Sequence, residues 1–600
     1  YGIVMGTSHH EPMTRAHAEW KPFQGGAWNY EKNEAKLREF WTDGIRRMGH
    51  YETLVTIGMR GDGDEAMTED TNIALLERIV KDQRVIIAST TGKKPEAVPQ
   101  VWALYKEVQD YYDKGMRVPD DVTLLLCDDN WGNIRKLPKV DEPKRAGGYG
   151  IYYHFDYVGG PRNYKWVNTN PLPRIWEQMH LAYRHGANQL WIVNVGDLKP
   201  MEFPISFFLD YAWAPDKIGA DDLQQYTTQW CSQQFGNAHA KEIAGYIATY
   251  GKLNGRIKPE LLNENTFSLD HYHEWEKVVE EWKTLLSGVT VLQKKIPEAQ
   301  QESYYQLVLH PVQACANLYE MYYYVALNHK YVRLNENIAN EFADKAKELF
   351  RKDSLITTDY HSRNNGKWDK MMSQTHIGYT YWQQPTVNKM PEVTYVVDAI
   401  EGFPEDEPVS TSAVKLVSSG EQGNVFFEFN KYVSIAAENY TRATGTNAIT
   451  WKVLPDHGRT GSAITPFPVT AEIQTLSDRS PHVEYAFYST SSGTMNVQLY
   501  FTPTLNFHHT ETGLQYAVSV DNEAPQIFSL NKEDGHLKTW ERWVAANINI
   551  KTSTHTIATP GRHVIKYWMV HQGVVLQKIV IDFGGVRPSY LGPPETRAKK

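Results

Sequence analysis

The sequence has 600 residues, more than a single hydrophobic core normally fills, so we expect several domains. Its 41% hydrophobic and 22% charged residues are ordinary for a globular protein, and a net charge of -9 argues against nucleic-acid and membrane-surface partners, which select basic surfaces. Cys127, Cys231 and Cys315 are too few and too widely spaced for a disulfide framework or a zinc site, so we expect the core to hold the fold.

Residues 1–219 alternate short apolar runs with helical stretches, a pattern typical of parallel strands covered by helices. Apolar residues at helical spacing predict helices over 33–48 and 72–82. The predicted strands cover residues 2–6, 54–58, 101–105, 122–127, 149–155 and 189–194. Six such units predict most of a (β/α)8 TIM-type barrel, with its first two strands missing from this chain.

The opening run from Tyr1 to Gly6 is predicted to be a buried strand, and no initiator methionine precedes it. We therefore expect that the natural N-terminus lies elsewhere and that any export signal is not visible in this sequence. No run of 18 apolar residues predicts a membrane-spanning helix.

Residues 220–390 contain longer helical stretches. Trp275, Val278 and Trp282 recur at the spacing of one helix face, which predicts the buried stripe of an amphipathic helix. We therefore expect this region to form an α-helical bundle.

Residues 391–600 begin with a linker-like segment and change to β patterning. Val483 and Tyr485 alternate with polar neighbours, and short apolar runs separated by glycine, proline and asparagine follow the same pattern. This region is predicted to form one or two β-sandwich domains.

Polar side chains follow every predicted strand of residues 1–219, where the active sites of such barrels lie. Hydrolysis of a glycosidic bond normally requires two carboxyl groups, one that protonates the leaving oxygen and one that activates water or attacks the sugar. Asp64 and Glu107 are the leading candidates because they follow adjacent predicted strands, where their carboxyl groups can face each other across a barrel mouth. For each residue, the alternative is a surface salt bridge or a helix cap.

The remaining candidates are predicted to bind substrate. Arg60 can pair with Asp62 or Asp64, or it can form a two-pronged pair with a substrate carboxylate. His9 and His10 lack the spacing of a zinc-binding helix, so we expect them to contact sugar hydroxyls or a carboxylate, and we expect no metal or cofactor.

Aromatic residues make up 12% of the chain, which suits carbohydrate binding. Trp131 can stack on a sugar ring or pack inside the barrel. Tyr152 and His154 are two positions apart in a predicted strand, so both should face the barrel lumen while Tyr153 faces the helices.

Five motifs together resemble the α-glucuronidases of glycoside hydrolase family 115. They are YGIVMGTSHHEPM at 1–13, MRGDGD at 59–64, YKEV at 105–108, CDDNWGN at 127–133 and YYHFDYVGG at 152–160. The resemblance extends over nearly the whole chain to SYLGPP at 589–594. It implies a catalytic barrel, a helical bundle, C-terminal β domains and a homodimer, in a secreted or periplasmic protein that degrades plant cell walls.

The same resemblance implies hydrolysis of α-1,2-linked glucuronic acid or its 4-O-methyl ether from glucuronoxylan or its oligosaccharides by an inverting mechanism. Asp64 and Glu107 match the family's acid and base, without showing which is which. Substrate contacts are implied for His9, His10, Arg60, Asn130, Tyr152 and His154. An inverting mechanism requires catalytic carboxyl groups about 6.5 to 9.5 Å apart.

Two other interpretations stay open at this stage. A non-catalytic carbohydrate-binding protein can keep the same scaffold, but it gains nothing from paired acids such as Asp64 and Glu107, which repel each other when ionised. An enzyme for another α-linked uronic acid or hexose differs only in the shape of its pocket.

Overall fold

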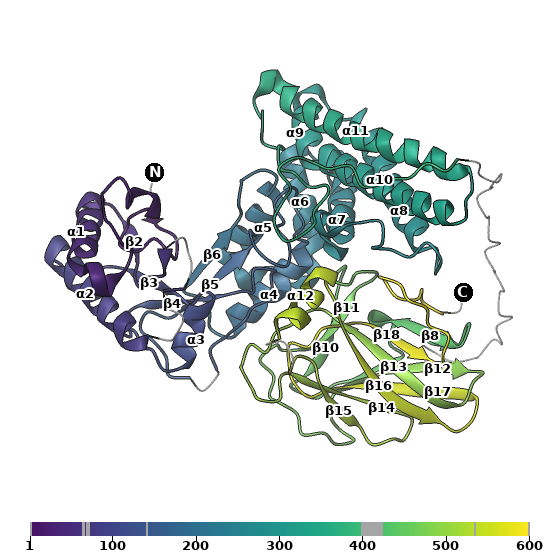
Figure 1. Ribbon diagram of the computed structural model, residues 1–600. Coiled ribbons are helices and arrows are strands. Elements are labelled where there is room, and N and C mark those ends of the chain that lie inside the picture. Colours follow the sequence, from purple (N-terminus) through teal and green to yellow (C-terminus); the bar gives the residue numbers. More distant parts are fainter. Residues whose placement is uncertain are drawn as a thin grey trace. The chain divides into compact units, whose positions relative to one another are not determined.

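The computed structural model describes residues 3–62, 66–67, 72–139, 142–397, 424–532 and 536–597 (Figure 1). The chain divides into two compact units. The first unit comprises Tyr1–His154, His180–Asn194 and Phe507–His509, and the second comprises Phe155–Met179, Val195–Asn506 and Thr510–Lys600. In the described part of the chain, no helix is both long and apolar enough to cross a membrane.

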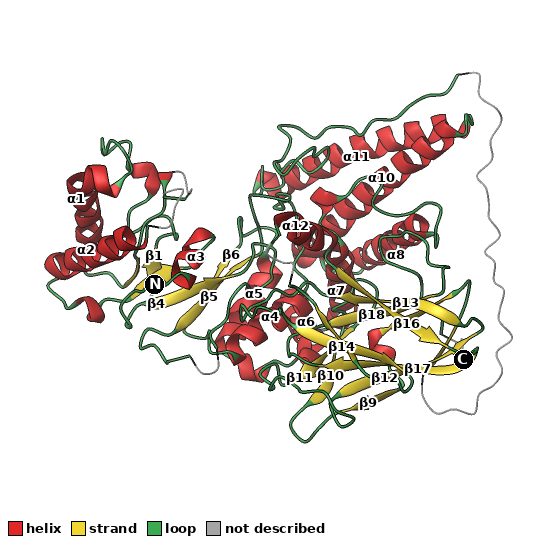
Figure 2. Ribbon diagram, turned by 60° about the horizontal axis from the view of Figure 1, so that its bottom comes forward, coloured by secondary structure: helices red, strands yellow, loops and turns green. Residues whose placement is uncertain are grey.

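A six-stranded parallel sheet, with its strands in chain order, forms the centre of the first unit (Figure 2). The strands are β1 (Met5–Gly6), β2 (Thr53–Thr56), β3 (Gln100–Ala103), β4 (Thr123–Cys127), β5 (Tyr149–His154) and β6 (Leu190–Asn194). All six predicted strands are therefore confirmed, with ends that shift by up to three residues. The pairing of Cys127 with Tyr152 and of His154 with Asn194 brings the carboxyl ends of β4, β5 and β6 to the same edge of the sheet.

The first strand differs from the prediction of a buried strand over residues 2–6. Only Met5 and Gly6 pair with β2, and Gly2 lies outside the described residues. Ile3, Val4 and Met5 are 67%, 56% and 64% exposed. The reason is position: β1 is the edge strand, and no described strand pairs with its other side.

Helices connect most of these strands: α1 (Tyr30–Met48), α2 (Ile73–Thr91), α3 (Glu107–Asp113) and α4 (Leu172–Arg184). The helices predicted over 33–48 and 72–82 are confirmed, and both are longer than expected. Asn29 and Asn72 cap the first two helices, because their side chains accept hydrogen bonds from the backbone N–H groups of Lys32 and Leu75, both at 3.0 Å. Gly92 ends α2 in the left-handed conformation.

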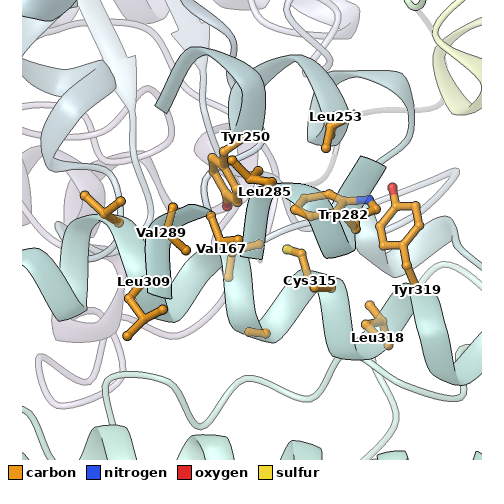
Figure 3. Close-up of a cluster of buried hydrophobic side chains, with 14 of the residues drawn as sticks. Val167, Tyr250, Leu253, Trp282, Leu285, Val289, Leu309, Cys315, Leu318 and Tyr319 are labelled. Carbon is orange, nitrogen blue, oxygen red and sulfur yellow. The ribbon is translucent and has the colours of Figure 1, made fainter. Parts of the chain in front are cut away.

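Among the described residues of the second unit, the α-helix α12 (Leu537–Ala546) lies within the C-terminal β-rich region, and seven further α-helices precede that region. They are α5 (Glu202–Trp213), α6 (Leu223–Phe235), α7 (Ala240–Arg256), α8 (Glu274–Gln293), α9 (Gln301–Tyr304), α10 (His310–Arg333) and α11 (Ile338–Gly366). The predicted stripe on α8 is confirmed, since Trp275, Val278 and Trp282 are all nearly inaccessible. It packs against α7 and α10 around Tyr250 and Leu318 (Figure 3).

The C-terminal region is rich in β-strands, as predicted. One sheet contains β10 (Thr450–Leu454), β11 (Ala463–Phe467), β18 (Leu576–Asp582), β13 (Gly493–Phe501), β16 (Asn549–Ile557) and β8 (Tyr432–Ala436). The other contains β15 (Gln526–Ser529), β14 (Gln515–Val520), β17 (Gly561–Met569), β12 (His482–Ser489), β7 (Val425–Phe427) and β9 (Arg442–Thr444). Phe501 of the first sheet contacts Tyr516 and Tyr567 of the second, with ring centroids 4.7 and 6.1 Å apart. Val483 and Tyr485 are fully buried, but their neighbours His482 and Ala486 are buried too, at 4% and 0% exposure, so the predicted alternation of buried and exposed positions is wrong for this strand.

Candidate functional site

The candidate site lies at the carboxyl ends of the strands in the first unit. His9 and His10 follow β1, Arg60 follows β2, and Glu107 is the first residue of α3, beyond β3. Asn130 and Trp131 follow β4, whereas Tyr152 and His154 belong to β5. Asp64 lies outside the described residues, so the structure places one of the two predicted catalytic carboxyl groups.

Arg60 and Glu107 form a two-pronged ion pair. The Nε of Arg60 donates to Glu107 Oε1 at 3.0 Å, and Nη2 donates to Oε2 at 2.8 Å. The Arg60 side chain is 4% exposed and that of Glu107 is 21% exposed, so the pair is only partly open to water. Asp62, which the sequence suggested as a partner for Arg60, instead lies 2.7 Å from His17 Nε2.

Gly58, two residues before Arg60, sets the direction of the turn that follows β2. Gly58 has φ +94, and a Cβ at this position would lie 2.8 Å from the indole nitrogen of Trp102. The Gln83 side chain bonds both polar groups of Gly58, accepting from its N–H at 2.7 Å and donating to its carbonyl at 2.8 Å. The backbone carbonyl of Arg60 accepts a further bond, from Trp28 Nε1 at 2.9 Å. A backbone that is bonded on both sides of the turn therefore positions the guanidinium.

A cluster of rings links the first and the fifth strands. The His9 ring lies 4.4 Å from Tyr105 and 5.6 Å from Tyr152, measured between centroids. Tyr152 and His154 lie 4.6 Å apart, which confirms that they share one side of β5. Tyr153, on the other side, is 2% exposed and donates to the Gly132 carbonyl at 3.2 Å.

Tyr105 joins this cluster although it was not predicted as a site residue. Its ring lies 6.1 Å from that of His154, and the Arg60 guanidinium carbon lies 5.5 Å from its centroid. The ring therefore connects the ion pair with the histidines. The available signal was its place two residues before Glu107, at the end of a predicted strand.

The turn after β4 is held by two consecutive carboxylates. Asp128 Oδ1 accepts from the Asn130 N–H at 3.0 Å and lies 2.6 Å from His154 Nδ1, whereas Asp129 Oδ1 accepts from the Trp131 N–H at 2.9 Å. Asn130 has φ +68, in the left-handed region, and Trp131 is 9% exposed. Sequence analysis gave Asp128 no role, although two adjacent aspartates at a strand end were a visible signal.

The chemistry of this site follows from its donors and acceptors. A guanidinium, imidazoles, a carboxamide and phenols suit a ligand that carries both hydroxyl groups and negative charge. Burial raises the pKa of the nearby Cys127 thiol, which makes it a poor nucleophile. Among the described residues, no group of three or more His, Cys, Asp or Glu side chains could hold a metal ion.

Two protein-family models match the chain. The model of glycosyl hydrolase family 115 matches residues 1–261, and the model of the family 115 C-terminal domain matches residues 425–595. Comparison with curated proteins gave no match.

Among solved structures, the family GH115 4-O-methyl-α-glucuronidase BtGH115A, described as having specificity for decorated arabinogalactans, is 26% identical with a TM-score of 0.77. The match covers 97% of this chain and 71% of that one. The C-terminal CBM6 of LamC from Zobellia galactanivorans is 15% identical and covers 25% of this chain and 98% of that one, with a TM-score of 0.17. The family 35 carbohydrate binding module from Clostridium thermocellum is 13% identical. The match covers 25% of this chain and 97% of that one, also with a TM-score of 0.17. These last two TM-scores are too low to support an argument.

Proposed function

We propose that this chain, which belongs to glycoside hydrolase family 115, removes α-1,2-linked glucuronic acid or its 4-O-methyl ether from xylan. The observation that carries the proposal is the forked pair of Arg60 with Glu107, placed beside histidines at the carboxyl ends of parallel strands. Family membership makes the protein a glycoside hydrolase, so the interpretation as a binding protein without turnover is no longer favoured.

The charges of the site support a uronic acid as the sugar that is released. A neutral hexose needs hydroxyl contacts only, whereas glucuronate also needs a cation for its carboxylate. Arg60 is a buried guanidinium that pairs with Glu107 and lies beside the Tyr105 ring, and the rings of His9 and Tyr152 lie next to Tyr105. This set of side chains favours glucuronate over glucose.

We propose that Asp64 and Glu107 share the acid and base roles of a single inverting displacement. In that mechanism one carboxylic acid protonates the leaving xylose oxygen, while the other carboxylate activates a water on the opposite face of the sugar. The two carboxyl groups must then lie about 6.5 to 9.5 Å apart, and a distance of about 5 Å would indicate a covalent intermediate instead.

The finer architecture is part of the same proposal. We assign residues 1–219 to a TIM-type barrel that includes β1–β6, residues 220–390 to an α-helical bundle and residues 391–600 to β-sandwich domains. We also propose a homodimer and a secreted or periplasmic location. These assignments rest on the resemblance of the chain to its family.

A second substrate follows from one comparison. BtGH115A is described as specific for decorated arabinogalactans, and its structure matches 97% of this chain. Glucuronic acid on an arabinogalactan is therefore the alternative to glucuronic acid on xylan. The same acid is released in both cases, so the two substrates differ in the polysaccharide that the protein must accept.

Release of 4-O-methyl-glucuronic acid from glucuronoxylan and from arabinogalactan, measured in parallel, tests the proposal. We expect release from xylan to be faster, and we expect both Asp64→Asn and Glu107→Gln to lower it about 10³- to 10⁴-fold in folded protein. Faster release from arabinogalactan would change the substrate assignment. Binding of xylan without any release would overturn the proposed activity.

A further inference from the structure

We propose that Asp128 is a positioning residue that holds His154 and Asn130 together as one recognition unit for the glucuronate. This inference goes beyond the proposed catalytic pair, and it rests on the proposed function for the identity of the ligand. The Asp128 carboxylate bonds both of the other residues, and its side chain is fully buried.

The carboxylate of Asp128 determines where the His154 ring carries its proton. Asp128 Oδ1 lies 2.6 Å from Nδ1 of His154, and the two side chains are 0% and 2% exposed. A carboxylate only accepts hydrogen bonds, so Nδ1 must carry the hydrogen in this contact. The partner of one ring nitrogen sets the role of the other, so Nε2 is directed to interact on the opposite edge of the ring.

The same carboxylate holds the backbone that presents Asn130. Asp128 Oδ1 accepts from the Asn130 N–H at 3.0 Å, and Oδ2 accepts from the Gly132 N–H at 3.2 Å. Asn130 has φ +68, in the left-handed region that asparagine adopts more readily than most residues, and the two bonds to Asp128 fix the turn in this conformation. One carboxylate therefore fixes two predicted substrate contacts that come from neighbouring strands.

Capping of the turn alone does not explain the position of Asp128. The neighbouring Asp129 already supports the turn, because it accepts from the N–H groups of Trp131 and Asn133 and from the Asn133 side chain. Asp128 adds a connection to β5: its Oδ2 accepts from the His154 backbone N–H at 3.0 Å, in addition to the ring contact. Two bonds to the same histidine orient both its backbone and its ring.

A double-mutant cycle tests the inference. Asp128→Asn retains one acceptor oxygen where the carboxylate has two, so it cannot accept from the ring and from all three backbone N–H groups at once. We expect Asp128→Asn to lower kcat/KM for a 4-O-methyl-glucuronosyl substrate about 10- to 100-fold, mainly through KM, as losses of supporting hydrogen bonds commonly do. If Asp128 acts through His154 and Asn130, adding Asp128→Asn to His154→Gln should lower kcat/KM by less than Asp128→Asn does in the wild type, and the remaining loss is the part that acts through Asn130.

Another buried aspartate–histidine pair provides the matched control. Asp353 Oδ1 lies 2.9 Å from His376 Nε2 in the second unit, at a similar burial. Asp353→Asn should lower the melting temperature and leave kcat and KM of the folded protein unchanged. Additive losses in the double mutant, or a loss of stability by Asp128→Asn with unchanged kinetics, would overturn the inference.

Binding of free 4-O-methyl-glucuronic acid separates this inference from the proposed activity. If the wild-type protein releases no acid from either polysaccharide, the proposed function fails, but calorimetry still reports whether Asp128→Asn weakens binding of the acid. A higher Kd in Asp128→Asn than in the wild type supports the role of Asp128 even then. An unchanged Kd overturns that role, whether or not the wild type is active.

Discussion

Two buried aspartate–histidine pairs in this protein have the same chemistry and different surroundings. His376 in the second unit has both ring nitrogens bonded, one to Asp353 and one to the Gln374 carbonyl at 2.8 Å, and its face stacks on Trp166 at 3.5 Å. His154 in the first unit pairs with Asp128 among the tyrosine and histidine rings of the candidate site.

The comparison shows that a buried aspartate–histidine pair does not by itself indicate a functional site. Asp353 also accepts from Asn388 at 3.3 Å, so this pair attaches the loop around residues 374–388 to α11. The pair of Asp128 stands where parallel strands end and where Arg60 and Glu107 also lie. This place in the fold makes the Asp128–His154 pair a candidate for function, whereas the Asp353–His376 pair supports the structure.

The largest expected effect is a loss of activity when Glu107, at the carboxyl edge of the sheet, is replaced. Glu107→Gln should lower kcat about 10³- to 10⁴-fold, the upper part of the range for loss of a general acid or base, while the fold remains intact. Initial rates on glucuronoxylan and a thermal melt measure the two effects. Glu96→Gln is the matched control, because Glu96 pairs with Arg84 at 3.0 Å and is 57% exposed. Equal losses of activity in both variants would contradict a catalytic role for Glu107.

The next largest effect is on stability in acid, from the helical region. Burial lowers the pKa of His310 from 6.5 to about 3, so the folded protein keeps this ring neutral while the unfolded chain binds a proton near pH 6.5. Its contribution to stability is complete above pH 6.5 and is lost as the pH falls towards 3. We expect a loss on the order of 4 kcal/mol at pH 3.

Urea unfolding of the wild type and of His310→Phe between pH 3 and pH 7 measures this effect. The variant should show a flatter dependence on pH, because phenylalanine fills a similar volume and does not titrate. Parallel curves for the two proteins would show that other groups dominate the acid response.

A smaller effect in the same direction, but at alkaline pH, is expected in the β region. Burial lowers the pKa of Lys578 from 10.5 to about 8, and its Nζ donates to the carbonyls of Leu591 and Pro593 at 3.0 and 3.2 Å. Between pH 8 and 10.5 the unfolded chain binds more protons than the folded protein, so stability should rise with pH, by an amount on the order of 3 kcal/mol. Lys578→Met should remove this rise in unfolding experiments at alkaline pH. A rise of the same size in the variant would assign it to other groups.

The smallest effect is expected from a conservative change at the sheet edge. Arg60→Lys keeps the charge and loses the fork that, in our proposal, also contacts the glucuronate carboxylate, so we expect KM to rise about 10- to 30-fold, equivalent to roughly 2 kcal/mol. Steady-state kinetics on a glucuronosyl oligosaccharide measures this change. Arg78→Lys, which alters a pair with Glu34 at 2.7 Å and 50% exposure, is the matched control. An unchanged KM for Arg60→Lys would show that the fork serves Glu107 alone.

The amino-acid sequence by itself determined the elements of secondary structure and the kinds of side chain at the strand ends. Short apolar runs that alternate with helical stretches predicted β2 to β6, and the stripe from Trp275 to Trp282 predicted α8. These signals are local, because side-chain spacing along a few residues decides which face of an element is buried. The position of β1 at the edge of the sheet depends on which strands pair, and its own residues do not encode it. The prediction that β1 is buried was therefore wrong.

Only the tertiary structure decided which of those side chains meet. Arg60 was recognised from its position, but its partner is 47 residues away and could have been any acid at the same sheet edge. The contact of Asp128 with His154 spans 26 residues and depends on the register between β4 and β5. Such pairings follow from strand register and helix packing, which no short segment of sequence contains, so the sequence supplied the candidates and the fold selected the partners.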